Sequence, residues 1–164
     1  MIDLELGEVI RKTLPEFAVI GKEGRGLVSE GSSWVPELWE LATRDFEELA
    51  QAANQCELST IELWGLMSDD KRWLDPWQTT GRYLAGMQFP HEVEAPYSWT
   101  RWVLPAMEYL VVKTDEANLE MMTEKMFTEI LPQEKAELVA AIQERYLPEF
   151  ASGEVELYFP VKII

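Results

Sequence analysis

The sequence lacks most of the residues from which common reactive centres are built. It contains one cysteine, Cys56, and one histidine, His91, so an internal disulfide is excluded and a zinc cluster lacks its thiol and imidazole ligands. No stretch approaches the roughly 20 apolar residues of a membrane-spanning helix. No Gly-x-x-x-x-Gly-Lys phosphate loop or nucleophile-elbow motif occurs. These absences predict a soluble cytoplasmic protein that uses neither a metal nor a cofactor.

Basic residues are also scarce. The chain has 14 lysines and arginines against 30 aspartates and glutamates, which gives a net charge of −16, and the basic residues form no cluster. Because a phosphate backbone would be repelled, the chain by itself is not expected to bind nucleic acid. The same charge favours the approach of small cations to a cleft. An acidic surface of this kind is also compatible with a basic protein partner.

The first half of the chain contains a strand pattern, a helix pattern and two further strand patterns. Residues 17–22 form an apolar run that leads into a glycine-rich turn, which predicts a strand. Residues 35–53 carry apolar side chains at spacings of three and four, which predicts one helix, with Ser32 or Ser33 as its N-cap. Two more strands are expected at residues 61–67 and 82–87.

The second half repeats this order. Residues 108–113 predict a strand, and residues 119–131 show helical spacing that ends at Pro132. Residues 138–146 and 154–161 then predict two closing strands. Sequence identity between the halves is faint, so the internal repeat is inferred from the order of the elements.

The expected fold is α+β, with a duplicated β-α-β-β module in a single domain of residues 1–164. The first half covers about residues 14–90 and the second about residues 105–164, with the intervening segment as the connection. Such a module gives a mostly antiparallel sheet with both helices on one face. We expect a ligand groove between the halves, on the sheet face that the helices leave uncovered.

Glu144 is the most informative acidic residue, because it lies where an apolar side chain is expected. In the predicted strand 138–146, two-residue alternation places Glu144 on one face with Leu138, Ala140, Ile142 and Tyr146. The opposite face is the expected solvated face. A buried carboxylate is costly unless it is paired or protonated, which makes Glu144 a functional candidate. Alternatively, Glu144 turns to solvent near the strand end or pairs with a local lysine or arginine.

Aromatic residues are abundant, with seven tryptophans and five tyrosines, and such side chains suit stacking on flat or cationic ligands. Trp64 and Trp102 are the tryptophans best placed for a groove. Trp39 is a further candidate, although its helical phase also suits the core. Tyr83 and Tyr146 lie on predicted strands, and a phenol beside a carboxylate can donate a hydrogen bond to it or manage a proton. Core tyrosines that only bond to backbone acceptors are the plainer alternative.

Several segments together resemble one known family, the GyrI-like small-molecule-binding domain. These are Gly21-Lys22-Glu23-Gly24-Arg25-Gly26, Trp34-Val35-Pro36-Glu37-Leu38-Trp39, Trp64-Gly65-Leu66-Met67-Ser68, Tyr83-Leu84-Ala85-Gly86-Met87, Trp102-Val103-Leu104-Pro105-Ala106 and Glu144-Arg145-Tyr146. The domain is similar to the effector-binding modules of AraC-type and MerR-type bacterial transcription regulators. The resemblance covers about residues 14–164 and implies a duplicated strand-helix-strand-strand fold with a cleft between the halves.

The resemblance also implies roles for individual residues. In multidrug-responsive relatives a glutamate in an aromatic pocket pairs with lipophilic cations, and Glu144 resembles it by position. Some stand-alone relatives are hydrolases that open cyclopropane-containing genotoxic compounds with a glutamate and a tyrosine, for which Glu144 and Tyr83 are the nearest candidates. Fewer than twenty residues precede the first predicted strand, too few for a helix-turn-helix, so a stand-alone domain is expected.

Three functions are therefore compatible with the sequence. The first is a stand-alone protein that captures amphipathic, aromatic or cationic ligands in an aromatic groove with Glu144 at its base. The second is a hydrolase in which Glu144 acts as general base, Tyr83 or Tyr146 donates a proton, and Trp64 and Trp102 form the walls. The third is an acidic modulator of a basic protein partner, similar to gyrase-inhibiting relatives.

Overall fold

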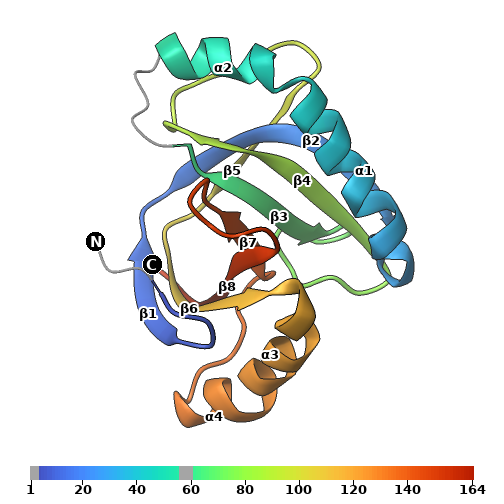
Figure 1. The fold of residues 1–164 in the computed structure, drawn as a ribbon. Coiled ribbons are helices and arrows are strands. Elements are labelled where there is room, and N and C mark those ends of the chain that lie inside the picture. The colour runs from blue at the N-terminus through green and yellow to red at the C-terminus, as the bar shows by residue number, and fades with distance from the viewer. Residues whose placement is uncertain (1–3, 56–60) are drawn as a thin grey trace.

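A computed structural model describes residues 4–55 and 61–164 (Figure 1). Cys56 lies outside these residues. The described chain forms one antiparallel sheet of eight strands in the order β1-β6-β8-β7-β3-β4-β2-β5. The strands are β1 (Val9–Leu14), β2 (Phe17–Leu27), β3 (Leu63–Asp69), β4 (Thr80–Phe89), β5 (Thr100–Leu104), β6 (Met107–Asp115), β7 (Gln143–Tyr146) and β8 (Glu154–Ile163).

The helices follow the second and sixth strands. The principal helices are α1 (Gly31–Arg44), α2 (Phe46–Gln55), α3 (Leu119–Lys125) and α4 (Leu131–Gln133). Short turns η1 (Val28–Glu30) and η2 (Glu116–Asn118) lead into α1 and α3, and a π-helical turn η3 (Met126–Ile130) joins α3 to α4.

Two short connections force the sheet to curl. Pro15 and Glu16 alone join β1 to β2, and Pro105 and Ala106 alone join β5 to β6. In a flat sheet each of these linked pairs would be six strand spacings apart, roughly 29 Å. A two-residue link spans at most about 11 Å between the flanking Cα atoms. The sheet must therefore bend until its two ends approach one another, which gives it a closed inner face and an outer face.

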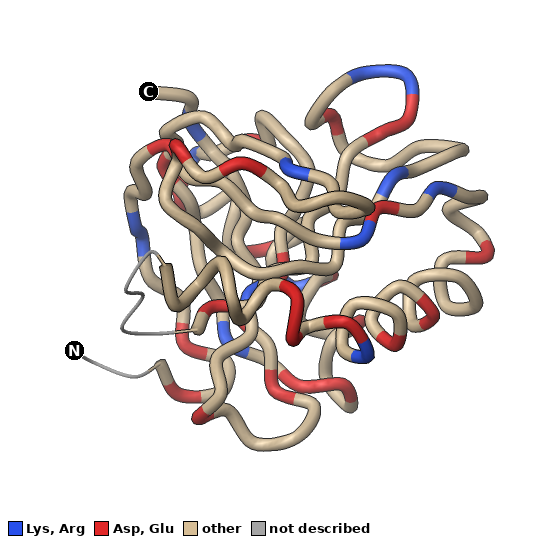
Figure 2. The backbone as a smooth tube through the Cα atoms, turned by 90° about the horizontal axis from the view of Figure 1, so that it is seen from above, with Lys and Arg blue, Asp and Glu red and all other residues tan. Residues whose placement is uncertain are grey.

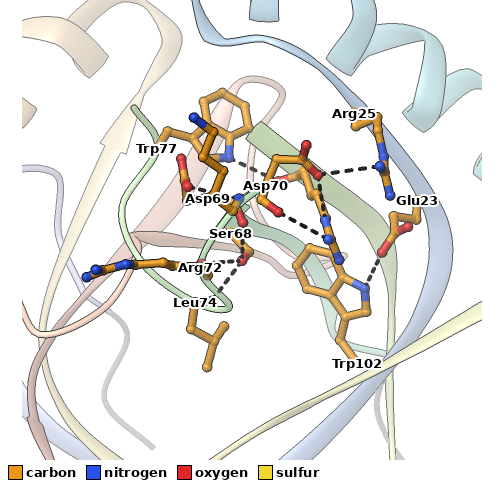
Figure 3. Close-up of polar contacts among 11 residues, drawn as sticks. Glu23, Arg25, Ser68, Asp69, Asp70, Arg72, Leu74, Trp77 and Trp102 are labelled. Carbon is orange, nitrogen blue, oxygen red and sulfur yellow. Dashed lines mark hydrogen bonds and ion pairs between the residues drawn. The ribbon is translucent and has the colours of Figure 1, made fainter. Parts of the chain in front are cut away.

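The inner face holds a hydrophobic core to which both halves contribute. Its largest fully buried members are Trp64, Tyr109, Tyr158, Leu66, Leu84, Leu104 and Met107. The β3–β4 connection closes one end of this core (Figure 3). There, Ser68 Oγ accepts a 2.7 Å hydrogen bond from the backbone N–H of Leu74, and Asp69 accepts bonds from the backbone N–H groups of Lys71 and Gln78. These bonds hold Leu74 at a φ of 66° with its side chain in the core.

The helices cover the two ends of the outer face. Helices α1 and α2 pack against a cluster that includes Ile20, Tyr83 and Met87, whereas α3 packs against Leu110, Leu157 and Phe159 among others. Figure 1 shows α1 and α2 on one side and α3 and α4 on the other, with β3 and β7 between them. The predicted α+β fold, with an antiparallel sheet and helices on one face, is confirmed.

Several predicted boundaries were wrong. The expected single helix over residues 35–53 is two helices that meet at Asp45, and α1 begins at Gly31, before the predicted serine cap. Ser33 instead donates its hydroxyl to the carbonyl oxygen of Glu30. Strands β1 and β5 were not predicted, because both are short edge strands whose charged or proline-flanked sequences carry a weak strand pattern.

The predicted strand 138–146 is also shorter than expected. Only β7 is strand, and within β7 the expected solvated face is buried, since Gln143 is 0% and Arg145 is 9% exposed. Arg145 pairs there with Glu62 and with Glu156, the latter at 2.8 Å. Residues 138–142 form extended connections instead, with backbone N–H groups bonded to β8 and to the β3–β4 connection.

The inner core offers a direct stability test. The Tyr109 hydroxyl is buried without a hydrogen-bond partner among the described residues, whereas the Tyr158 hydroxyl accepts a 3.3 Å bond from Lys12 Nζ. We expect Tyr109→Phe to keep or raise the free energy of unfolding by up to about 1 kcal/mol, and Tyr158→Phe to lower it by about 0.5–1.5 kcal/mol, both measured by urea denaturation. A clear loss of stability in Tyr109→Phe would mean that its hydroxyl is bonded.

Candidate functional site

The centre of the outer face is formed by β7, the strand that joins the two halves. It pairs with β3 on one side and with β8 on the other. Glu144 lies opposite Gly65 in β3 and Leu157 in β8. Because successive side chains of a strand alternate, Glu144 and Tyr146 point outward between the helices while Gln143 and Arg145 point inward. The carboxyl group therefore lies on the seam of the fold.

Two phenols and one indole organise this carboxyl group. The Tyr83 hydroxyl donates a 2.6 Å hydrogen bond to Glu144 Oε1, and the Tyr83 oxygen accepts a 2.9 Å bond from Trp39 Nε1–H. The Tyr146 hydroxyl donates a longer bond of 3.4 Å to the same Oε1. The short Tyr83 bond is typical of a phenol that donates to an ionised carboxylate. Both donors converge on one oxygen, and no donor among the described residues bonds to Oε2.

A cavity of about 260 Å³ lies beside this carboxyl group, lined by Trp39, Leu63 and Tyr146. The Trp39 and Tyr146 rings meet edge to face with centroids 5.4 Å apart. Leu63 pairs with Tyr146 across the strands, and two residues further along β3 Gly65 pairs with Glu144. Glu144 is not among the described lining residues, and it is connected to the cavity through its hydrogen bond with the lining residue Tyr146. We call Trp39, Leu63, Tyr83, Glu144 and Tyr146 the Glu144 pocket.

Burial governs the protonation of this pocket. Desolvation raises the pKa of Glu144 above its ordinary value, although the hydrogen bonds from Tyr83 and Tyr146 oppose the rise. Desolvation, followed by the charge of Glu144, raises the pKa of Tyr83 and of Tyr146 well above the ordinary value for tyrosine. The phenols therefore keep their protons at neutral pH and act as donors, while Glu144 is the group that can change charge.

Gly65 makes the phenol–carboxyl contact possible. A Cβ atom at this position would lie 2.7 Å from Glu144 Oε1 and 2.6 Å from Tyr83 Cζ, and closer still to the Tyr83 hydroxyl. The hydrogen bond between Tyr83 and Glu144 thus passes directly over the glycine. Sequence reasoning missed this residue, although an isolated glycine inside a strand is a known signal of close approach by another group.

The structure brings together four of the six residues singled out from the sequence. Glu144, Tyr83, Tyr146 and Trp39 form one network. Trp64, by contrast, alternates with Leu63 and Gly65, so it points into the inner core, where its Nε1–H donates to Gln88 Oε1 at 2.8 Å.

Trp102 likewise belongs to the inner core cluster. Its Nε1–H donates a 2.7 Å bond to Glu23 Oε1 (Figure 3). Its ring meets that of Trp73 edge to face. The cavity beside Glu144 therefore lies on the helix-bearing face, not on the uncovered face expected from the sequence. The curl of the sheet turns the other face into the inner core.

The remaining charges leave Glu144 without a basic partner in the described part of the chain. Arg145 is occupied by Glu62 and Glu156 on the opposite face of β7. Figure 2 shows acidic positions around the whole backbone, with basic positions scattered among them. Within residues 4–55 and 61–164, no group of histidine, cysteine, aspartate and glutamate side chains is arranged to hold a metal ion. In the same residues, none of the helices has both the length and the apolar character required to span a bilayer.

Comparisons with known proteins agree with this architecture. The family model of the GyrI-like small molecule binding domain matches residues 8–162. A search of curated proteins finds no match. The structure of SAV2435 bound to tetraphenylphosphonium is similar, with a TM-score of 0.67, 14% identity and 94% of each chain covered. The integron cassette protein VCH_CASS2 from the mobile metagenome of Vibrio cholerae gives a TM-score of 0.60, 12% identity, and coverage of 95% of this chain and 96% of that one.

A third similar structure is the C-terminal domain of EcmrR. It gives a TM-score of 0.58 at 15% identity, and the match covers 98% of this chain and 100% of that domain. At such low identities these likenesses concern the fold.

The close approach over Gly65 predicts a large effect from a single methyl group. We expect Gly65→Ala to lower the free energy of unfolding by about 1–3 kcal/mol, because the Cβ would displace the Tyr83 hydroxyl and the Glu144 carboxyl. Gly31→Ala is the matched control, since its Cβ would meet Trp77 at an ordinary 3.4 Å in the first turn of α1. Equal stability of the two variants in urea denaturation would contradict this account of Gly65.

The raised pKa of Glu144 predicts how stability depends on pH. A folded-state pKa above the ordinary 4.5 means that the native state binds the Glu144 proton more tightly, so this contribution is full below pH 4.5 and is lost as pH rises through the raised pKa. Relative to the wild type, Glu144→Gln should therefore gain stability as pH rises, and the gain should level off above that pKa. Urea denaturation at several pH values measures it. A difference that does not change with pH would contradict the shift.

Proposed function

The chain belongs to the GyrI-like small molecule binding domain family, and from this premise we propose that the Glu144 pocket captures amphipathic, aromatic or cationic small molecules. Glu144 supplies the counter-charge, and Trp39 and Tyr146 supply the aromatic surface. The captured molecule is either sequestered or sensed through a partner protein.

One observation carries this proposal. Glu144 is a partly buried residue whose carboxyl group has both phenol donors on Oε1, no basic partner among the described residues, and an apolar, aromatic cavity beside it. A buried carboxylate needs a compensating charge, and attraction to a cation is stronger where water is excluded. Aromatic rings add cation–π attraction. A cation with an apolar body meets all these requirements, whereas an anion meets none of them.

Two further facts favour a cationic ligand. The net charge of −16 raises the local concentration of small cations around the molecule. In addition, the structural neighbour SAV2435 was solved with tetraphenylphosphonium, which is itself a cation with an apolar aromatic surface. Since that neighbour is 14% identical, it supports the choice of a probe and does not fix the natural ligand.

The same geometry supports a second candidate function, hydrolysis of a strained or otherwise electrophilic xenobiotic. The 2.6 Å bond between Tyr83 and Glu144 favours it, because a carboxylate can activate water while a neighbouring phenol donates a proton to the leaving atom. Capture and hydrolysis differ in their products. Mass spectrometry after prolonged incubation with cyclopropane-containing electrophiles finds an altered species only if the pocket is catalytic.

Binding of tetraphenylphosphonium tests the primary proposal. By isothermal titration calorimetry we expect wild-type protein to bind this cation, with affinity that rises with pH as Glu144 ionises. We expect Glu144→Gln to bind it at least about tenfold more weakly and without that pH dependence, because the glutamine leaves the bound cation without a counter-charge in the pocket. Glu92→Gln, at an exposed loop residue, removes the same charge outside the pocket and should bind as wild type. Undiminished binding by Glu144→Gln would remove Glu144 from the site.

A further inference from the structure

A second cavity adjoins the Glu144 pocket. Its volume is about 280 Å³, and it lies between α2 and the sheet. Its lining residues are Phe46, Ala50, Ala53, Asn54, Ile61, Leu63 and Met87. Leu63 also lines the first cavity, so one side chain has a cavity on each side. We call the second cavity the α2 cavity.

The floors of the two cavities form one continuous row of side chains across three strands. Leu63 in β3 pairs with Tyr146 in β7 and with Met87 in β4. Directly opposed side chains of an antiparallel pair have Cβ atoms about 4.5–5.5 Å apart. Tyr146 and Leu63 line the first cavity, and Leu63 and Met87 line the second. The two cavities are therefore neighbours that share the side chain of Leu63.

The α2 cavity is kept open by the way α2 is held. Phe46, Ala50 and Ala53 are spaced by four and three residues, so they lie on one face of α2, and the two alanines fill little space. The helix is anchored elsewhere, since Leu49 is fully buried and Glu48 Oε2 accepts a 2.6 Å bond from Trp99 Nε1–H. These anchors prevent α2 from closing onto the sheet.

The lining of the α2 cavity is apolar and differs from that of the Glu144 pocket. Asn54 is the one polar residue among the described lining residues, and none of them is charged. A charged head group would therefore find no counter-charge there. A hydrocarbon chain needs none and can pack against the apolar side chains. Each cavity alone is smaller than the roughly 300–1,000 Å³ of ordinary ligand sites, and the two together reach that range.

We propose that the α2 cavity is an apolar subsite for an arm of the same ligand whose cationic head binds at Glu144, which narrows the ligand class to cations with a hydrocarbon arm of several carbons. This proposal rests on the proposed function. Leu63 separates the site of the cationic head group from the site of the hydrocarbon arm. Ala53 and Met87 limit the length and breadth of the arm that the α2 cavity can hold.

A pair of probes with the same head group tests the subsite. Methyltriphenylphosphonium and hexyltriphenylphosphonium carry the same charge and aromatic surface and differ by five methylenes. Calorimetric titration of wild-type protein should give an affinity that rises with chain length, by up to about fourfold per buried methylene. Ala53→Leu, which fills the subsite, should bind the methyl compound as wild type does and lose most of the gain with the hexyl compound.

Matched variants separate the possible outcomes. Gln51→Leu adds the same side chain to α2 at an exposed position outside the cavity lining and should behave as wild type. Ala50→Leu fills the subsite independently, should Ala53→Leu fail to fold. Equal affinity for both probes in the wild type, or a chain-length gain that persists in both filled variants, would overturn the subsite alone. Failure of the methyl compound to bind, or binding unaffected by Glu144→Gln, would instead overturn the proposed function.

Discussion

The curl of the sheet is the constraint on which the rest of the structure depends. The two-residue links between β1 and β2 and between β5 and β6 draw the ends of the sheet together, and the inner face becomes a sealed core around Trp64, Tyr109 and Tyr158. Hydrophobic side chains pack against one another on that face. The helices then cover the two ends of the outer face, and β7 with its neighbours remains between them (Figure 1). The position of the candidate site is thus determined first by the short links between strands, and side-chain chemistry then determines what the site can bind.

Strand alternation then divides the charges of β7 between the two faces. Arg145 points inward and forms ion pairs with Glu62 and Glu156. Its buried positive charge is thus compensated within the fold. Glu144 points outward, receives two phenol hydrogen bonds, and has no basic partner in the described chain. A register shift of one residue would exchange these environments and leave a glutamate in the inner core. The pairing of Glu144 with Gly65 excludes that shift, because only glycine leaves space for the carboxyl group and the Tyr83 hydroxyl together.

The sequence predicted the order of elements and the helix-bearing sheet, because these follow from local periodicity, and it singled out Glu144 as one acid in an apolar phase. It did not predict which way each strand faces. Trp64 and Gly65 are adjacent, and alternation alone cannot decide which of them points toward the helices; that depends on the curl, which arises from links distant in sequence. The break between α1 and α2 was missed because apolar spacing continues across Asp45. Trp39 was predicted either to lie in the core or to line the groove. It packs against the hydrophobic cluster under α1 and α2, and its indole N–H also donates a hydrogen bond to Tyr83.

The Glu144 pocket is preorganised at a cost in stability. Desolvation disfavours the charged form of Glu144, as its raised pKa records, and the Tyr83 and Tyr146 donors offset only part of that penalty. The Trp39–Tyr83–Glu144 chain fixes the carboxyl group through Oε1, so a ligand that approaches Oε2 meets an acceptor already held in place and loses little entropy in ordering it. A cation would both relieve the unpaired charge and cover the aromatic wall. Binding of a cation at Glu144, as proposed, would therefore restore stability that the fold gives up to keep a carboxylate unpaired.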